Sequence, residues 1–203
     1  IRAAQVSCVV AGKKLARRWR RVLTAEFPSV KEYGLLPSDN PRVVVPMDSP
    51  RHVVAALRLH CPGRWISRLA LKVASAMARA GNLDLLRSRL LLIATRDRHF
   101  RPLGAVGAGL FDRCADQDVD FALYLGTPNA NRKTVVLPLG QTDPQQVLKV
   151  AGNPTARASL RREAAALSVL ADSPLAGHVP KLGDLVVSSN EISLYEEYRV
   201  PKK

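Results

Sequence analysis

The sequence predicts an α+β fold, in which a five-stranded antiparallel sheet with one packed helix follows a mostly helical basic region. Apolar residues recur at helical spacing through much of the first half of the chain. Short apolar runs separated by turn-forming residues occupy the second half. We therefore divide the 203-residue chain into a basic, mainly helical region with one or two short strands at 1–115 and a sheet region at 116–203.

The two halves differ in charge. Residues 1–100 contain 19 Lys and Arg against 6 Asp and Glu, a net charge of +13, whereas residues 101–203 contain 12 against 11, a net charge of +1. We expect the basic half to attract an anionic partner, namely nucleic acid, a phosphorylated sugar or a membrane surface.

Composition also bears on location and metal binding. No apolar run approaches the ~20 residues that a membrane span requires. The three cysteines are far apart and lack the spacing of metal ligands, so we expect no metal site. This cysteine usage favours a reduced, cytoplasmic setting, with the inner face of the membrane as the alternative.

Three elements are predicted at the start of the first half. Residues 3–26 have the spacing of a helix, residues 33–41 that of a loop, and residues 42–46 that of a short strand. The basic block at 13–21 permits two interpretations, a grip on phosphates or a solvated face with Trp19 turned into the core. One aromatic residue is a poor stacking platform, which favours the second interpretation.

Two further helices are predicted, at 49–59 and 64–80. Ser49 is a suitable N-cap, and Gly81-Asn82 is a suitable C-terminal stop. The helix at 64–80 is amphipathic and basic, so it could lie on anionic lipid, although packing on a core is commoner. Residues 83–89 suggest a helical turn, and residues 90–94 suit a buried strand or the end of a helix.

The second half predicts strands at 121–125, 134–139 and 147–150, a fourth strand from the segments 179–182 and 184–187, and a fifth at 192–195, with a turn-rich loop at 126–133 and a helix at 155–170. Lys149 lies between Leu148 and Val150 in a strand that otherwise looks buried. An ammonium group in such a place needs a partner. Glu163 adjoins the apolar stripe of the helix and can supply one, the alternative being an exposed glutamate paired with Arg157 or Arg161.

This ordered set of elements resembles the N-terminal lobe of the protein-kinase-like superfamily, most closely its aminoglycoside and small-molecule phosphotransferase branch. The matching features are Gly126 with its Asn-containing loop, V-L-K-V at 147–150, R-R-E at 161–163, V-P-K-L at 179–182 and L-Y-E-E-Y at 194–198. The resemblance covers only the sheet region and does not account for residues 1–115.

The resemblance implies an ATP site. Lys149 would orient the phosphates, Glu163 would position Lys149, and the loop would cover the nucleotide. One of two valines would form the floor of the adenine pocket, and backbone groups at the end of the last strand would bind adenine. The implied nucleotide-binding residues are Gly126, Thr127, Asn129, Asn131, Val135, Val136, Lys149, Glu163, Glu197 and Arg199.

The sequence lacks the H-x-D-x-x-x-x-N catalytic loop of that superfamily and a later metal-binding aspartate. We therefore expect no catalytic residue here. The chain would be the nucleotide-binding part of a small-molecule or sugar phosphotransferase, inactive unless joined to a C-terminal lobe that would also hold most of the Mg²⁺. The alternatives are a non-catalytic basic module that binds polyanions or an anionic membrane, and a pseudokinase-type scaffold. No oligomeric state is predicted.

Overall fold

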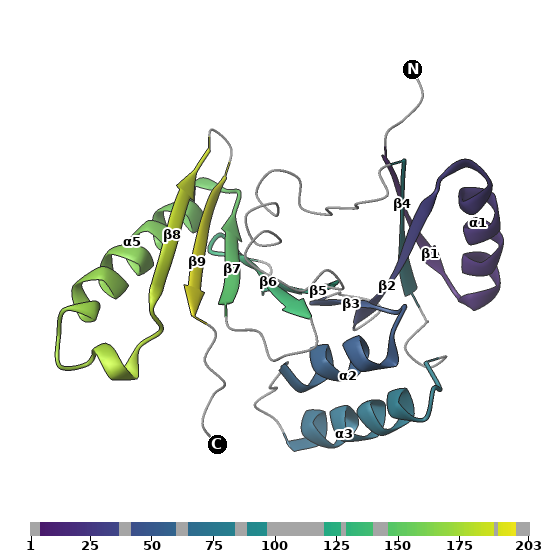
Figure 1. Cartoon of the computed structure of the whole chain (residues 1–203), viewed down its shortest axis with the longest axis horizontal. Helices are drawn as coiled ribbons and strands as arrows, with labels where there is room; N and C mark the ends of the chain where they lie inside the picture. The colour runs from purple at the N-terminus through teal and green to yellow at the C-terminus, as the bar shows by residue number, and fades with distance from the viewer. Residues whose placement is uncertain are drawn as a thin grey trace. The chain divides into compact units, whose positions relative to one another are not determined.

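The computed structural model describes residues 5–36, 42–59, 65–83, 89–96, 120–126, 129–139, 146–188 and 191–197. The chain divides into two compact units, Ile1–Ala108 and Gly109–Lys203 (Figure 1). The sequence had placed this division between residues 115 and 116.

The first unit contains four antiparallel strands in the order β1-β4-β2-β3. The strands are β1 (Gln5–Ala11), β2 (Ser29–Leu36), β3 (Val43–Pro46) and β4 (Arg89–Thr95), and the helices are α1 (Lys13–Glu26), α2 (Pro50–Leu59) and α3 (Trp65–Arg79). Helix α1 buries Ala16 and Leu23. Leu90, Leu92 and Ala94 of β4 are almost fully buried, so β4 forms much of the core of this unit.

The predicted fold class is wrong. The described part of the chain contains nine strands, and four of them belong to the first unit. That unit is therefore a sheet with helices and not a mostly helical region placed before a five-stranded sheet.

The main cause of this error is β1, which we had predicted as the start of a helix over residues 3–26. The spacing of Val6, Val9 and Val10 suits a helix, but residues 5–11 pair along their whole length with β4. Strand pairing overrides a local pattern of this kind because β-branched residues pack well in a sheet. Gly12, with φ of 82°, then separates the strand from α1.

The loop predicted over residues 33–41 is also wrong at its start, because Tyr33 to Leu36 belong to β2. Tyr33 lies opposite Leu91 of β4 and Pro46 of β3, so pairing on both sides keeps this segment extended. Residues 37–41 lie outside the described residues.

Several local predictions in the first unit are confirmed. Strand β3 matches the run at 42–46, and α2 and α3 match the two predicted helices. Residues 90–94, which suited a strand or a helix end, belong to strand β4. Helix α3 ends as its sequence indicates: Gly81 has φ of 75°, and the N–H of Asn82 donates to the carbonyl of Met77 at 2.9 Å. Of the turn predicted at 83–89, residues 84–88 lie outside the described residues.

The second unit contains five antiparallel strands in the order β5-β6-β7-β9-β8. They are β5 (Asp120–Leu125), β6 (Thr134–Leu139), β7 (Gln146–Ala151), β8 (Leu182–Val187) and β9 (Ile192–Glu197), accompanied by helix α5 (Pro154–Ala171) and a short 3₁₀ turn (Ala176–His178). Helix α5 begins at Asn153, whose side chain accepts a hydrogen bond from the N–H of Ala156 at 2.8 Å, and Pro154 follows as the first helical residue.

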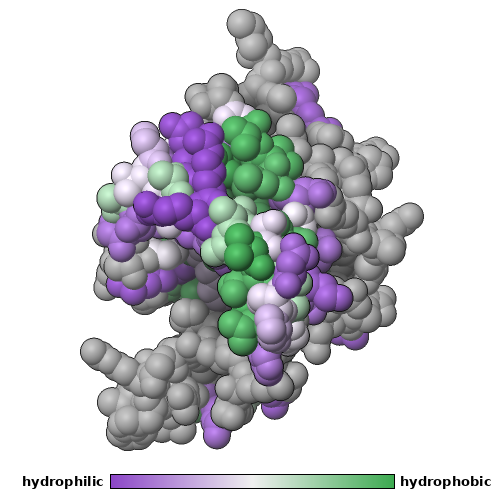
Figure 2. Space-filling view, turned by 90° about the vertical axis from the view of Figure 1, so that its left-hand side faces the viewer, coloured by the Kyte–Doolittle hydropathy of each residue, from purple (hydrophilic) through white to green (hydrophobic). Residues whose placement is uncertain are grey.

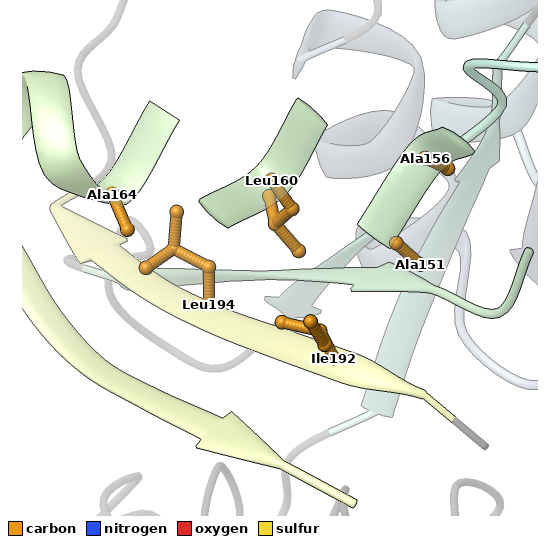
Figure 3. Close-up of a cluster of buried hydrophobic side chains, with 6 residues drawn as sticks. All are labelled: Ala151, Ala156, Leu160, Ala164, Ile192 and Leu194. Carbon is orange, nitrogen blue, oxygen red and sulfur yellow. The ribbon is translucent and has the colours of Figure 1, made fainter. Parts of the chain in front are cut away.

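Helix α5 packs on β7 and β9 through small and branched side chains, which Figure 3 shows meeting between the helix and the two strands. The cluster consists of Ala151, Ala156, Leu160, Ala164, Ile192 and Leu194, five of them fully buried and Ala164 nearly so. Directly paired residues of neighbouring strands point to the same side of a sheet. Because Lys149 is paired with Leu194, it lies on the side of the sheet that α5 covers.

Strand β8 ends the strand order and carries three consecutive exposed apolar residues, Leu185, Val186 and Val187. Figure 2 views the molecule from the side on which α5 and β8 lie in Figure 1, and hydrophobic surface is visible there among hydrophilic side chains. Within the part of the chain that the structure describes, no helix is both long enough and apolar enough to cross a membrane.

Candidate functional site

Four charged side chains meet between α5 and the sheet of the second unit. The Nζ of Lys149 donates to Oε1 of Glu163 at 2.6 Å, and the Nζ of Lys133 donates to Oε2 of the same carboxylate at 2.5 Å. Lys149 also forms an ion pair with Oε1 of Glu196. We call Lys133, Lys149, Glu163 and Glu196 the lysine–glutamate cluster.

Each member comes from a different place in the unit. Lys149 lies in the middle of β7, and Glu196 lies on β9 opposite Val147, which is on the same side of β7 as Lys149. Glu163 lies on α5 between Leu160 and Ala164, both of which face the sheet. Lys133 is the last residue of the hairpin loop before β6. The packing of α5 on the sheet therefore brings the four groups together.

The cluster is largely withdrawn from water. The side chains of Lys149 and Lys133 are each 21% exposed, and those of Glu163 and Glu196 are 28% and 7% exposed. At this depth an ion pair is screened less than at the surface, and an unpaired charge is costly. With two ammonium and two carboxylate groups, the cluster has no formal net charge.

Mutual pairing holds Lys149 and Glu163 in their charged forms. Burial alone would lower the pKa of Lys149, but hydrogen bonds to Glu163 and Glu196, together with their negative charges, raise this pKa above its ordinary value. Burial alone would raise the pKa of Glu163, but hydrogen bonds from Lys133 and Lys149, and their positive charges, lower it.

The predicted contact between Lys149 and Glu163 is present in the structure. The alternative, in which Glu163 is exposed and pairs with Arg157 or Arg161, does not describe the contacts that its carboxylate makes with Lys149 and Lys133. The assigned role of the pair in binding a nucleotide stays a prediction.

The described end of the loop that we expected to cover a nucleotide, residues 129–132, forms a turn. The N–H of Asn131 donates to the side-chain oxygen of Asn129 at 2.9 Å, and the N–H of Arg132 donates to the carbonyl of Asn129 at 3.1 Å. A Cβ added at Gly126 would lie 3.0 Å from the carbonyl oxygen of Lys133, so glycine allows the two ends of the loop to approach closely. Thr127 lies outside the described residues.

The strand register distinguishes the two valines that alternation left open. Val135 lies opposite Lys149 on β7 and opposite Tyr124 on β5, so it shares the side of the sheet that carries the cluster. Val136 lies opposite Leu148 and is completely buried on the other side. Of the two, only Val135 is placed to line a ligand bound at Lys149.

The structure pairs Glu197 with Lys181. The backbone N–H of Glu197 donates to the carbonyl of Lys181 at 2.9 Å, and a Glu197 carboxylate oxygen accepts from the N–H of Lys181 at 3.1 Å. The predicted contact of its carbonyl with adenine stays a prediction. Arg199 lies outside the described residues.

Sequence reasoning missed two members of the cluster, Lys133 and Glu196. Glu196 could have been found, because alternation along β9 places it on the same side as Ile192 and Leu194, which pack against α5. Lys133 had no comparable signal, since a lysine at the end of a loop is ordinarily solvated. No group of three or more His, Cys, Asp or Glu side chains within the described ranges could hold a metal ion.

No family model, no curated protein and no solved structure matches the chain.

Proposed function

We propose that the second unit binds the phosphates of a nucleotide, with ATP as the first candidate, at the ammonium group of Lys149. In this proposal the unit is the nucleotide-binding part of a phosphotransferase that acts on a small molecule or a sugar hydroxyl, as its resemblance to the kinase-like superfamily implies. The transfer itself would need acidic residues to hold Mg²⁺ and to accept a proton, and we assign none in this chain.

The observation that carries the proposal is a lysine in the middle of a strand, held by a carboxylate of the packed helix. The 2.6 Å contact between Lys149 and Glu163 gives the ammonium group a defined position, and pairing keeps it charged. A positioned cation at low solvent exposure attracts phosphate oxygens more strongly than a solvated one does. Lys133, on the second oxygen of Glu163, holds that carboxylate from the other side and lies next to the loop.

The charge balance of the cluster makes the proposal specific. Lys149 donates to two carboxylates and has a third N–H for a phosphate oxygen, but two glutamates already balance the two lysines, so the added negative charge is accommodated best if one carboxylate turns away. Glu196 is the better candidate to do so, since Glu163 keeps Lys133 as a second partner. In the proposed bound state, Lys149 donates to Glu163 and to a phosphate oxygen, while Glu196 has turned away.

A titration with a fluorescent ATP analogue tests the proposal. We expect Lys149→Ala to weaken binding at least about tenfold, the loss typical of a charge-assisted hydrogen bond. We expect Glu196→Gln to tighten binding several-fold, because it removes the carboxylate that competes with phosphate. Lys181→Ala is the matched control, since Lys181 is an exposed lysine of the same unit.

Equal affinity of the wild type and Lys149→Ala would contradict the proposal. Weaker binding by Glu196→Gln would also contradict it, because the glutamate would then support the ligand and not compete with it. Thermal unfolding of each variant separates loss of binding from loss of the fold.

A further inference from the structure

Helix α1 of the first unit carries an apolar surface that its own sheet does not cover. Leu15, Trp19 and Val22 are 43%, 43% and 53% exposed. At intervals of four and three residues they form one line along the helix. The buried residues Ala16 and Leu23 lie next to this line, so the apolar side of α1 is wider than its contact with the sheet. We call Leu15, Trp19 and Val22 the α1 strip.

Cations border the strip on the side away from the sheet. Successive residues of a helix are rotated by about 100°, so exposed Lys14, Arg18 and Arg21 lie next to the α1 strip, on the side opposite the buried residues Ala16 and Leu23. On the other side of the buried line, Arg20 forms an ion pair of 3.7 Å with Glu32 of β2 and ties the helix to the sheet. Around the helix, the order is therefore sheet contact, apolar strip and cations.

Charge on α1 has one predominant sign. The helix contains six Lys and Arg residues and a single acidic residue, Glu26, at its last position. In Figure 1, α1 lies on the outer side of β1, β4 and β2, and no other described element of the first unit lies over the side of the helix that faces away from these strands.

We propose that the α1 strip and its border of cations bind the surface of an anionic lipid bilayer. Leu15, Trp19 and Val22 enter the boundary between headgroups and acyl chains, while Lys14, Arg18 and Arg21 contact lipid phosphates. A helix with an apolar face beside a strongly basic one is the arrangement that lies in a bilayer interface, where tryptophan is favoured.

Lipid suits this surface better than nucleic acid does. A nucleic acid backbone would use the cations but would gain little from a line of aliphatic side chains, and one aromatic side chain is a poor platform for stacking bases. Exposed apolar side chains together with cations match a partner that has both acyl chains and phosphates. The exposed apolar residues of β8, Leu185 to Val187, are preceded in the sequence by Asp184 and followed by two serines, so the adjoining residues supply no cation.

Vesicle co-sedimentation with the whole chain tests the proposal. The probes are vesicles of phosphatidylcholine alone and vesicles with about 30% phosphatidylserine, which carry the negative surface potential that attracts basic segments. We expect binding only to the anionic vesicles. Two variants, Trp19→Ser with Val22→Ser and Arg18→Glu with Arg21→Glu, should each lower the partition coefficient at least about tenfold.

Matched controls come from the second unit. Val169→Ser with Leu175→Ser removes two exposed apolar side chains, and Arg161→Glu with Arg162→Glu reverses two exposed cations on α5. Both control proteins should sediment with anionic vesicles as the wild type does.

Three results would overturn the proposal: equal binding to neutral and anionic vesicles, no binding to either, or unchanged binding by Trp19→Ser with Val22→Ser. In the third case only the charge variant would lose affinity, and duplex DNA would displace the vesicles, which would identify a general polyanion site.

A spectroscopic measurement guards against variants that fail to fold. In the Trp65→Phe protein, Trp19 is the remaining tryptophan of the two in the chain. Its emission should move to shorter wavelength with anionic vesicles and should be quenched by brominated acyl chains. An unchanged spectrum contradicts insertion of the strip. Because neither assay involves ATP or Lys149, this proposal can fail while the nucleotide proposal stands, and the reverse.

Discussion

The two units fasten a helix to a sheet with charged side chains, but they place the charges in opposite ways. In the first unit the cation, Arg20, is on the helix and the carboxylate, Glu32, is on the strand, 3.7 Å apart and with the guanidinium half exposed. In the second unit Lys149 is on the strand and Glu163 is on the helix, 2.6 Å apart and mostly buried.

The two units therefore differ in the number of their positive charges and in how accessible these charges are to a partner. The first unit has 20 Lys and Arg against 6 Asp and Glu, a net charge of +14, whereas the second has 11 of each. Exposed cations on α1 are available to a large anionic surface. In the second unit Lys149 is mostly buried and its charge is balanced, which is why we propose a small ligand there and not a large surface.

The largest expected effect is the difference in stability loss between truncating a buried leucine of α5 and truncating an exposed leucine of α1. Leu160→Ala on α5 removes a side chain that is fully buried in the cluster of Figure 3, so we expect a loss of about 3 kcal/mol in the free energy of unfolding. Leu15→Ala, the same truncation on the exposed strip of α1, should cost less than about 0.5 kcal/mol. Urea denaturation followed by circular dichroism measures both, and equal losses would contradict the assigned burial.

A smaller effect is expected when the cation of each ion pair is removed. Lys149→Met leaves Glu196 buried without its cation, and we expect a loss of about 2 kcal/mol in the free energy of unfolding. Arg20→Met also removes the cation beside a buried carboxylate, Glu32, but that contact is longer and its guanidinium is half exposed to water, so we expect a smaller loss, below about 1 kcal/mol.

Adding Glu196→Gln to Lys149→Met should recover part of the loss, because the second change removes the unpaired carboxylate. A double variant no more stable than Lys149→Met alone would contradict the idea that the loss comes from leaving the Glu196 carboxylate without its cation.

The smallest effect is the pH dependence of the second unit. The pKa of Glu163 is lower in the folded chain, so its contribution to stability is complete above the unfolded value of about 4.3 and is lost as pH falls through the lowered folded value. The pKa of Lys149 is higher in the folded chain, so its contribution is complete below about 10.4 and is lost as pH rises through the raised value.

Urea denaturation between neutral and acidic pH checks this sign. Stability of the wild type should fall more steeply on acidification than that of Glu163→Gln, which has no carboxyl group to protonate at this position. Parallel curves for the two proteins would show that Glu163 gains no stability from its two lysines.

Local chemistry was enough to predict many single elements. Asn153-Pro154 begins a helix in most contexts, Gly81-Asn82 ends one, and the run at 147–150 has the composition of a strand. The pairing of Lys149 with Glu163 was also predictable, because a charged group among aliphatic neighbours requires a partner and the glutamate adjoins an apolar stripe.

Pairing between distant segments decided the rest. Residues 5–11 are a strand because residues 89–95 pair with them. Their β-branched residues permit a strand, but the local sequence does not identify the partner segment. Trp19, which we had expected in the core, is exposed because the sheet beneath α1 covers only part of its apolar side. Lys133 joined the cluster because the hairpin loop ends at the position of Glu163.

The sequence by itself determined the unequal charge of the two units, the strand that carries Lys149 and the helix that carries Glu163, because charge and local propensity belong to neighbouring residues. Only the tertiary structure decided that the first unit contains a sheet, that Lys133 and Glu196 complete the cluster, and that the α1 strip stays exposed. These outcomes depend on contacts between segments that are distant in the sequence, because such contacts decide which residues are buried and which strands pair.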